Sequence, residues 1–585
     1  MTMEEPRAPV PDPERLDLRA FVGTLRAGEA DGAFLGALLP ATYEAPERFR
    51  RALYAHAARR PGGLKSRPGE GYDVYHDCVV AHLGRRRRAL VSVGAAGDQE
   101  VSYESLHLRA GALAAAWQSA GVAPGQAVAV VLPPSVEHVV ALLAALRLGA
   151  VISALPPLGP AFVQHRLARL APDHVVIAER HRHLAAQGEA ALLPLAAAPR
   201  GEGAPPPSHW YAPDAPAARL LSVFGDPAAA PVELTAAALH EALLRDGLLV
   251  LGLDEADTLA APGLDPAQHA PHLALAALAA GAACAEIAPG DAEADPRLLE
   301  RAGVTVLGVS RRLRDAVLRG GAPAVPRSAR AWFRSLTEVV EPERWDAFAR
   351  ALWARKVPGF GVAGAAAAAG VHLFSPPSPP SPTSLVPRVW PAPGRPWLLA
   401  ELAAGALPAL NAAGMYTPLR DGAPDLAGLP RLVLVREPDG FTLAGAVDVG
   451  RDAHAYPTAE VARVVEREPL VRHAAVVVSP GRAPSDAKIT AIAFVEGERG
   501  PDGRVALPVG PRAIAARIAR EMGEPFAPDR VEIFPLRPRL LDGVADEAWC
   551  RAQYLGGALH DKARSELFVL LSRLGYILAR PPGAE

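Results

Sequence analysis

The stretch that most constrains the fold runs from Ala127 to Pro157, with the sequence AVAVVLPPSVEHVVALLAALRLGAVISALPP. It begins with a valine-rich run that predicts a buried strand, and two prolines end that run because proline has no N–H to donate to a neighbouring strand. Ser135 can cap the helix that follows by accepting a backbone N–H, and Gly149 ends it. A second apolar run predicts another strand. Strand, helix and strand within about 30 residues indicate a βαβ unit, and therefore a parallel sheet that is buried on both faces.

Chain length and composition limit the class of protein. The chain has 585 residues, too many for one ordinary domain, and half of them are apolar, so extensive cores can form. The formal net charge of −2 provides no long-range attraction for nucleic acid or for an anionic membrane. Cys78, Cys284 and Cys550 lack metal-binding spacing, which is typical of a reducing compartment. The N-terminus does not resemble a signal peptide, and no uncharged apolar run is long enough to span a membrane. We therefore expect a soluble, cytoplasmic protein.

The order of the remaining patterns predicts an α/β fold. Strand-like and helical runs alternate through most of the chain, which indicates a large N-terminal domain of doubly wound sheets with helices. Within it, Leu220–Val223 is predicted as a strand and Glu233–Gly252 as a helix. Near the C-terminus the pattern is typical of a small α+β domain. We assign 1–60 to an N-terminal extension with helices, 61–445 to the large domain, 446–556 to the small domain and 557–585 to a terminal helix.

Three segments of the large domain have other distinctive compositions. Arg85–Arg88 has no interleaved aromatic residue, so we interpret it as a solvated turn and not as a nucleic-acid site. Phe374–Pro396 is rich in proline and serine, which predicts an extended polyproline-type loop without an assigned role. His269 and His272 have a spacing found in metal sites, but without a neighbouring cysteine or carboxylate in the sequence we expect structural roles.

Several segments together resemble the adenylate-forming, or AMP-binding, superfamily, in particular acetyl- and acyl-CoA synthetases. That family has a helix ending in G-x-x-P-G-D, a strand, a P-N/P-S-x-E turn, a second helix and a G-A-V strand. The match here is GVAPGQAVAVVLPPSVEHVVALLAALRLGAVISALPPLGP. Near the C-terminus, DGFTLAGAVD is similar to the hinge motif D-G-y-x-x-x-x-G-R-x-D, and PTAEVARVV is similar to the helix that follows it. The segments keep the family order over roughly Tyr54–Trp549.

The resemblance implies both an architecture and a reaction. It implies a large domain and a small domain that rotates about the hinge between two half-reactions. Those half-reactions are the adenylation of a carboxylate by ATP with Mg²⁺ and the transfer of the acyl group to CoA. ATP or AMP and CoA are therefore implied as cofactors by the resemblance alone.

Two phosphate- and nucleotide-binding segments of the family are altered. The loop S-G-T-T-G-x-P-K-G corresponds to FGDPAAAPVE, where Gly225 is kept, an aspartate and a proline replace the threonines, and lysine is absent. An aspartate repels a polyphosphate and a proline removes an N–H donor. The segment Y-G-x-T-E corresponds to FGVAG, where Phe360 and Gly361 are kept and could form a shelf for adenine. Ala363 and Gly364 replace the threonine and the metal-binding glutamate, which argues against Mg²⁺ binding.

The hinge and the small domain are altered in the same way. The hinge keeps Asp448 but has alanine in place of its arginine, and His454 aligns approximately with a histidine-containing G-H-R loop. The aspartate that binds ribose in the family would fall near Leu432, where no carboxylate lies. The catalytic lysine of P-K-T-x-S-G-K would lie within Leu536–Trp549, which contains no lysine. None of the four lysines of the chain occupies a family position.

We therefore predict no catalytic residue and no metal ligand. The residues that match binding positions of the family, by motif position only, are Gly225, Phe360, Gly361, Asp448 and His454. The favoured hypothesis is a catalytically degenerate member of the AMP-dependent acyl-CoA synthetases with a ligand-binding, regulatory or scaffold role. Two alternatives stay open. One is an active, divergent adenylate-forming enzyme that uses arginines where its relatives use lysine. The other is a binding module that keeps only the acyl or CoA half of the site.

The expected partners follow from the same reasoning. A small carboxylate, a nucleotide or CoA could bind, whereas nucleic acid and membranes are not expected. A protein partner or a second copy could contact the terminal helices. Those helices are predicted at Leu18–Leu39, Ala45–Arg59 and Gly557–Leu578.

Overall fold

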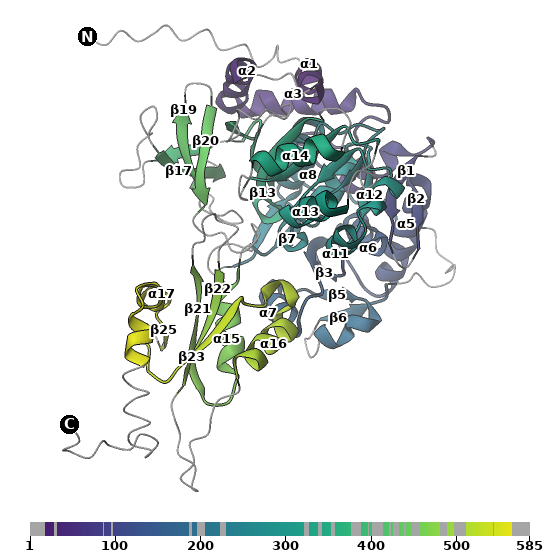
Figure 1. The fold of residues 1–585 in the computed structure, drawn as a ribbon. Coiled ribbons are helices and arrows are strands. Elements are labelled where there is room, and N and C mark those ends of the chain that lie inside the picture. Colours follow the sequence, from purple (N-terminus) through teal and green to yellow (C-terminus); the bar gives the residue numbers. More distant parts are fainter. Residues whose placement is uncertain are drawn as a thin grey trace, which may run out of the picture. The chain divides into compact units, whose positions relative to one another are not determined.

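The computed structural model divides into two compact units, shown in Figure 1 and described separately below. The larger unit contains Met1–Pro157 and Arg166–Asp448, and the smaller one contains Leu158–His165 and Val449–Glu585. The residues that the structure describes are 18–27, 32–85, 87–94, 97–185, 190–195, 205–222, 230–320, 327–336, 342–352, 357–375, 388–395, 397–400, 413–420, 423–424, 432–437, 440–446, 456–479, 488–495, 510–541 and 543–563.

The predicted βαβ unit is confirmed. Strands β3 (Ala127–Val131) and β4 (Val151–Leu155) are parallel, and α6 (Val136–Leu148) connects them. The Ser135 side chain caps α6 by accepting a hydrogen bond from the His138 N–H. Every residue of α6 except Glu137 is buried. The helix is therefore a core helix and not a surface helix with one apolar face.

The unit belongs to a six-stranded sheet with the order β6-β5-β3-β4-β7-β8. Two sequence predictions near its edge were wrong. The strand β7 ends at Leu220 instead of starting there, and the first residues of the predicted helix form the antiparallel strand β8. Arg219 and Glu233 form an ion pair across these two strands, and Thr235 then caps α8 by accepting from the Ala238 N–H. The new bounds are β5 His174–Ile177, β6 Ala191–Leu193, β7 Pro216–Leu220, β8 Val232–Thr235 and α8 Ala236–Arg245.

The second sheet of the larger unit has 14 strands. Its central strands are parallel and have the order β1-β10-β9-β11-β12-β13. Antiparallel strands extend it on the β13 side and β2 on the β1 side. The parallel strands are β1 Arg88–Ser92, β9 Thr258–Ala260, β10 Ala283–Glu286, β11 Val306–Gly308, β12 Ala331–Ser335 and β13 Gly359–Ala365. The others are β2 Gln99–Ser102, β14 Gly370–Phe374, β15 Arg388–Pro391, β16 Trp397–Ala400, β17 Ala413–Arg420, β18 Ala423–Pro424, β19 Leu432–Glu437 and β20 Gly440–Ala446.

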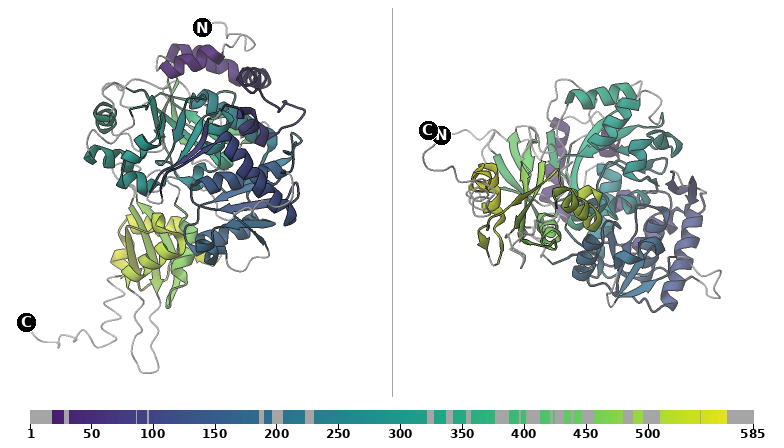
Figure 2. Two further views of the ribbon diagram at one scale, coloured as in Figure 1. Left: turned by 90° about the vertical axis from the view of Figure 1, so that its right-hand side faces the viewer. Right: turned by 60° about the horizontal axis from the view of Figure 1, so that its bottom comes forward.

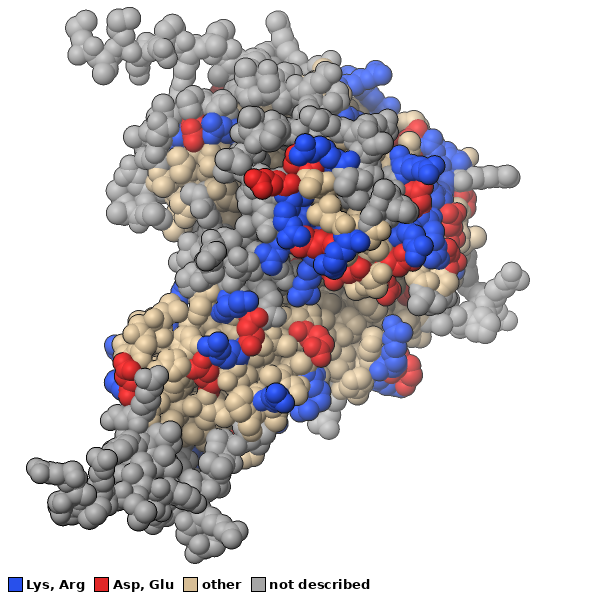
Figure 3. Space-filling model, viewed as in Figure 1, with Lys and Arg blue, Asp and Glu red and all other residues tan. Residues whose placement is uncertain are grey.

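Buried apolar side chains of α6, α8 and α10 join both sheets into one core cluster. Most of the remaining helices of the larger unit connect strands of the second sheet, and Figure 3 shows acidic and basic side chains next to one another on the face that carries them. These helices are α4 Val74–Cys78, α5 Tyr103–Ser119, α9 Pro266–His269, α10 His272–Ala279, α11 Pro289–Ala294, α12 Arg297–Arg301, α13 Arg311–Gly320 and α14 Pro342–Leu352.

The N-terminal helices are part of the larger unit, as Figure 2 shows in purple. The first predicted helical pattern is two helices, α1 (Leu18–Ala27) and α2 (Gly32–Glu44), and α3 (Pro46–Ala58) follows. Their buried apolar side chains, including Phe21 and Phe49, belong to the main core cluster of the unit. These faces are therefore occupied within the chain itself.

The smaller unit has the predicted α+β character. Strands β21 and β22 are antiparallel, β22 and β23 are parallel, and β24 and β25 form a separate hairpin. Residues 158–165, which include the start of α7, also belong to this unit, and the Gly159 N–H donates to the Met522 carbonyl at 3.0 Å. Of the predicted terminal helix, residues 558–563 are helical and the rest lies outside the described residues. The elements are the first part of α7 (Pro160–Leu170), up to His165, together with α15 Thr458–Glu466, β21 Val471–Ser479, β22 Lys488–Val495, α16 Pro511–Met522, β23 Arg530–Phe534, β24 Leu540–Leu541, β25 Val544–Ala545 and α17 Glu547–Leu555.

Candidate functional site

The arrangement of β9, β10 and β11 marks the place where the topology of the larger unit favours a ligand. The strands β10 and β11 follow β9 along the chain but pair with opposite edges of it. In open α/β sheets, ligands bind outside the carboxyl ends of the strands where the order reverses in this way. A cavity of about 70 Å³ lies here, lined by residues that end β9 and β10 and by α9, α10 and the start of α6. We call it the β9–β10 pocket.

The walls of the β9–β10 pocket are mostly apolar. Leucine, isoleucine and alanine side chains line it together with five prolines, namely Pro134, Pro262, Pro266, Pro271 and Pro289. Four side chains in the lining carry polar or titratable atoms, namely His138, His269, Cys284 and Glu286. Lysine, arginine and aspartate are absent from the described lining. A mainly apolar wall with a few polar groups is typical of sites for small molecules.

Cys284 and Glu286 lie on one face of β10 because side chains alternate along a strand. The Cys284 thiol donates a hydrogen bond to Glu286 Oε1 at 3.3 Å. Burial raises the pKa of Glu286 to about 7, and the hydrogen bond from Cys284 offsets only part of that effect. Burial likewise raises the pKa of the Cys284 thiol well above its usual value, so this cysteine stays protonated and unreactive. The pocket therefore contains an acid that titrates near neutral pH.

His138 supplies a second polar group to the pocket wall. It lies in the first turn of α6 and is 4% exposed. Burial lowers the pKa of its imidazole to about 4, so the ring is neutral at physiological pH. Its Nδ1 atom has no hydrogen-bond partner among the described residues. A buried polar atom without a partner is rare in proteins and calls for an explanation.

The segment that corresponds to the family's Y-G-x-T-E forms the strand β13. The Phe360 ring is 4% exposed and stacks on Phe333 of β12, with 5.3 Å between ring centroids. The Gly361 N–H donates to Ser375 Oγ at 2.6 Å, and a Cβ atom added to Gly361 would lie 2.5 Å from Leu336 Cδ2. The role of these two residues beside adenine stays a prediction, but both are built into the packed sheet.

Gly364, at the position of the family's metal-binding glutamate, has no room for a side chain. A Cβ atom there would lie 2.4 Å from the Gly370 carbonyl oxygen and 2.7 Å from the Val371 Cα atom. Both contacts are to backbone, which cannot rotate away as a flexible side chain would. The Gly364 carbonyl accepts a hydrogen bond from Gln268 Nε2 at 2.7 Å. The residues present therefore do not fit the Mg²⁺ ligand that the resemblance implies.

A buried ionic cluster holds the turn after Gly364 in place. Asp246 accepts hydrogen bonds from His272 Nε2 and from the Val371 N–H, both at 2.7 Å, and from Arg245 Nε. The Asp246 carboxylate also occupies the space where a Cβ atom of Gly370 would lie. The structural role predicted for His272 is confirmed by these contacts. Among the residues that the structure describes, no group of three or more His, Cys, Asp or Glu side chains could hold a metal ion.

The hairpin β24–β25 shows where the family's catalytic lysine would stand. The sequence PRLLDGV, residues 538–544, aligns with P-K-T-x-S-G-K when Gly543 takes the place of the motif's glycine. Gly543 has a φ of 83°, which favours glycine, and it lies in the turn between the two strands. Val544 then occupies the lysine position and is 59% exposed. The D-G dipeptide, a common hairpin turn, was the sequence signal that could have fixed this alignment.

The remaining residues that were predicted from family motifs are either buried in the fold or lie outside the described residues. Leu432, near the position of the ribose aspartate, is fully buried in β19. Gly225, Asp448 and His454 lie outside the described residues, as does the phosphate-loop segment 223–229. The structure brings together a different set of residues, the pocket group His138, Cys284 and Glu286, which no motif identified.

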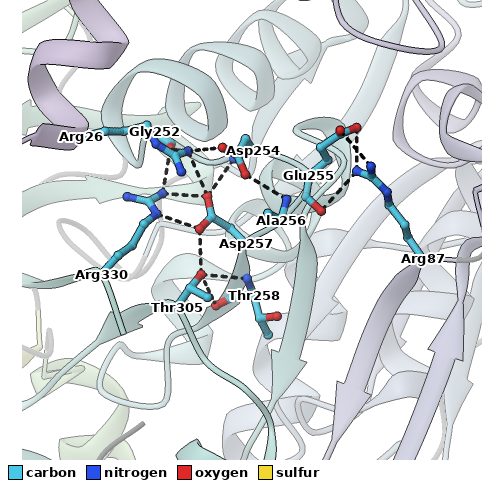
Figure 4. Close-up of polar contacts among 10 residues, drawn as sticks. All are labelled: Arg26, Arg87, Gly252, Asp254, Glu255, Ala256, Asp257, Thr258, Thr305 and Arg330. Atoms are coloured by element: carbon cyan, nitrogen blue, oxygen red, sulfur yellow. Dashed lines mark hydrogen bonds and ion pairs between the residues drawn. The ribbon is translucent and has the colours of Figure 1, made fainter. Parts of the chain in front are cut away.

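A cluster of charged side chains lies at the opposite, amino end of β9 (Figure 4). Arg330 makes two hydrogen bonds to Asp257, at 2.7 and 2.8 Å, and Arg26 of α1 reaches both Asp257 and Asp254. Burial alone would raise the pKa of Asp257. The hydrogen bonds from Arg330 and the positive charge of Arg330 outweigh this effect, so the pKa of Asp257 is lowered. The cluster thus attaches α1 to the sheet by paired charges.

The prediction that Arg85–Arg88 is a solvated turn was wrong for two of its arginines, which form ion pairs. Arg85 and Arg87 both pair with Glu255, at 3.0 and 2.6 Å, and their side chains are only 25% and 35% exposed. Figure 4 shows Arg87 reaching Glu255 beside the Asp257 cluster. Sequence reasoning missed this because the acidic partner lies about 170 residues further along the chain.

Solved structures share this arrangement of strands and helices. The amide bond synthetase McbA from Marinactinospora thermotolerans aligns with a TM-score of 0.62 and 19% identity over 82% of this chain and 99% of its own. A variant of o-succinylbenzoate CoA synthetase (MenE) from Bacillus subtilis, bound to the product analogue OSB-NCoA, aligns with a TM-score of 0.61 and 15% identity over 82% and 98%. The chain has the fold of the adenylate-forming enzymes.

Other comparisons agree with this fold. NpsA-ThdA, an artificially fused adenylation-PCP di-domain from Klebsiella oxytoca, aligns with a TM-score of 0.60 and 17% identity over 79% of this chain and 92% of its own. Residues 80–218 match the AMP-binding enzyme family. A stretch of 96 residues is 36% identical to an acetyl-coenzyme A synthetase from Halorhodospira halophila (strain DSM 244 / SL1) and spans 15% of that relative. The sequence resemblance to AMP-binding enzymes is thus confirmed.

Among the described residues, no helix is long and apolar enough to cross a membrane.

Proposed function

We propose that this chain is a catalytically degenerate relative of the AMP-dependent acyl-CoA synthetases that has kept a ligand-binding role. The observation that carries the proposal is the packing around Gly364. Backbone atoms of Gly370 and Val371 fill the space that a metal-binding glutamate would need. Recovery of the family chemistry would therefore require a change of backbone as well as a change of side chain.

Two further positions support the loss of adenylation. Val544 stands at the aligned position of the catalytic lysine and has no charge to offer an acyl-adenylate. The aligned phosphate loop lacks lysine and contains an aspartate and a proline. Phosphoryl and adenylyl transfer depend mainly on positioning and on neutralising charge, so the joint loss of cations and of a metal ligand removes the principal sources of catalysis.

The test is an ATP–pyrophosphate exchange assay on the full chain with a panel of short carboxylates. We expect no exchange above the background without enzyme, because the triphosphate and its metal lack their ligands. An active acetyl-CoA synthetase run in parallel shows that the assay detects turnover. Robust exchange with any carboxylate would refute the proposal.

The rival candidate, an active divergent enzyme, is favoured by one feature of the hairpin. Arg539 stands at the first lysine position of P-K-T-x-S-G-K and is 65% exposed at its side chain, where it pairs with Asp546 at 3.4 Å. Arginine does not reproduce the compact charge of lysine, but it can bind phosphate. A thermal-shift titration with ATP and Mg²⁺ separates the two candidates, since a ligand of the native state raises the apparent stability. Stabilisation at millimolar nucleotide supports the rival, and its absence supports degeneracy.

We also propose a cytoplasmic location. Cys78, Cys284 and Cys550 are all buried free thiols, as expected for a chain in a reducing compartment. Cell fractionation, with a cytoplasmic marker as reference, tests this location.

A further inference from the structure

We propose that the β9–β10 pocket binds a small aliphatic amine, whose ammonium group pairs with Glu286 and whose apolar body lies against the prolines and leucines of the wall. This inference rests on the proposed function because it names the ligand for the ligand-binding role proposed above. It does not depend on whether adenylation is lost. It differs from the carboxylate that the family resemblance implies.

The size of the pocket limits the ligand. A cavity needs roughly 10–15 Å³ to hold one water molecule. A pocket of about 70 Å³ therefore has room for about five water-sized groups. An amine with four or five non-hydrogen atoms, such as n-propylamine, fills this space.

The charges around Glu286 favour a cation. The titratable groups that line the pocket with it are Cys284 of β10, His138 of α6 and His269 of α9. Cys284 donates one hydrogen bond, and burial keeps both the thiol and the His138 ring uncharged near neutral pH. The described lining offers no lysine or arginine to neutralise a Glu286 carboxylate. Ionising a carboxylate that is largely removed from water is costly when no cation pairs with it, and a ligand that supplies the cation reduces that cost.

His138 provides the second contact. Its Nδ1 atom is buried and has no partner among the described residues. A neutral imidazole nitrogen can accept a hydrogen bond from an ammonium group or donate one to a neutral group. An ammonium group has three donors, enough to serve Glu286 and a nearby acceptor together. A carboxylate ligand would instead face Glu286 with the same sign of charge.

The proposal predicts how binding changes with pH. An ammonium ligand binds the ionised form of Glu286, whose pKa is raised to about 7 by burial. At pH 6 most of Glu286 is protonated, so an amine must displace that proton, whereas at pH 8 the carboxylate is already formed. Propylamine itself stays charged at both values. The apparent affinity should therefore fall about tenfold from pH 8 to pH 6, with release of a proton on binding at pH 6.

The experiment measures binding to the full chain by titration calorimetry and ligand-detected NMR, with n-propylamine, 1-propanol and propionate as probes. We expect propylamine to bind at pH 8 at least tenfold more tightly than the other two. Two buffers of different ionisation enthalpy at pH 6 report the released proton. Equal affinity for the amine and the alcohol, tighter binding of propionate, or no binding of any probe would overturn the proposal.

Two variants distinguish the effect of the Glu286 charge on binding from the effect of the shape of the pocket. Glu286→Gln keeps the size of the side chain and removes its charge, so propylamine should lose at least tenfold in affinity and all pH dependence, while 1-propanol is unaffected. Ala274→Leu fills part of the wall and should weaken both probes alike. A single cooperative melting transition above the assay temperature verifies that each variant folds. Full propylamine affinity in Glu286→Gln refutes the role of the carboxylate, whereas the exchange assay with ATP reports separately on adenylation.

Discussion

The two ends of strand β9 differ in how they hold charge. At its amino end, Asp257 is paired with Arg330 and Arg26, and the arginines lower the pKa of its carboxyl group. At its carboxyl end, Glu286 of the neighbouring strand has a thiol as its hydrogen-bond partner, and burial raises its pKa to about 7. The Asp257 carboxylate has two arginine counter-ions, whereas the described lining of the pocket around Glu286 contains no lysine or arginine.

The two edges of the sheet also differ in the roles that charged residues have there. Adenylate-forming enzymes need charge at the carboxyl edge, where ligands of α/β sheets bind. In this chain, ion pairs connect α1, β9 and β12 at the amino edge. At the carboxyl edge, Gly364 takes the position of the family's glutamate, and the nearby Asp246 is paired with Arg245 and His272. The ion pairs that stabilise the packing are therefore present, although the family's metal-binding glutamate is absent from its aligned position.

The largest effect should come from removing the buried acid at the amino end. Asp257→Ala leaves Arg330 and Arg26 without their shared partner, and breaking a buried pair in this way costs about 3 kcal/mol of the free energy of unfolding. Calorimetric melting of the full chain measures the loss. The matched control is Asp254→Ala, because Asp254 also pairs with Arg26 but its side chain is 40% exposed. The control should cost less than about 1 kcal/mol, and equal losses would contradict a buried network.

Adding one methyl group at the carboxyl edge should have the next largest effect. Gly364→Ala places a Cβ atom 2.4 Å from the Gly370 carbonyl oxygen. Overpacking of this kind costs about 1–3 kcal/mol, measured as a lower melting temperature. Gly290→Ala is the control, since nothing lies within 4 Å of its added Cβ atom. If both variants melt like the unmodified chain, space is available at Gly364 and the argument against a metal ligand fails.

Glu286 should make the free energy of unfolding depend on pH. The folded pKa of Glu286 is about 7 against an ordinary value of 4.5, so the folded state favours the protonated form. Its contribution to stability is complete below pH 4.5 and is lost as the pH rises through about 7. Glu286→Gln should therefore stabilise the chain by about 3 kcal/mol at pH 8 and by nearly nothing at pH 4. A stability gain that does not vary with pH would show that the acid is not perturbed.

Asp257 should show the opposite dependence. Its folded pKa is lowered, so the stability it contributes is present above the unfolded value and is lost as the pH falls. The difference in melting temperature between the unmodified chain and Asp257→Ala should therefore shrink on acidification. The two carboxyl groups thus provide internal controls for each other.

The smallest effect is expected at the hairpin. Val544→Lys restores the family lysine at a position that is 59% exposed, and it should change stability by less than about 0.5 kcal/mol. It should also fail to produce ATP–pyrophosphate exchange, because Gly364 and the phosphate loop remain unchanged. Exchange activity gained by this single substitution would mean that only one residue separates the chain from catalysis.

Local patterns were sufficient for much of the fold. The βαβ unit at Ala127–Pro157 and the capping role of Ser135 were predicted because they depend on periodicity and on neighbours in sequence. The boundary between β7 and α8 was misplaced because Glu233 pairs with Arg219 across two strands, a contact that periodicity does not report. The differences from the family motifs at Gly364 and in Leu536–Trp549 could be recognised from the sequence alone.

The candidate site could not be predicted in the same way. The pocket brings together His138, His269, Cys284 and Glu286, which come from three segments separated by more than one hundred residues of chain in the widest case. In the sequence Glu286 is an ordinary glutamate in an apolar run. Its raised pKa follows from burial, and burial is a property of the packed structure.

The sequence by itself therefore determined the α/β elements, their order, the resemblance to adenylate-forming enzymes and the absence of the family's charged side chains. The tertiary structure decided where charge is paired and where it is not. It showed that backbone fills the space beside Gly364 and that Glu286 faces a small pocket whose described lining contains no lysine or arginine. The physical reason is that propensity and capping act between residues close in sequence, whereas packing, burial and ion pairing act between residues that only the fold brings together.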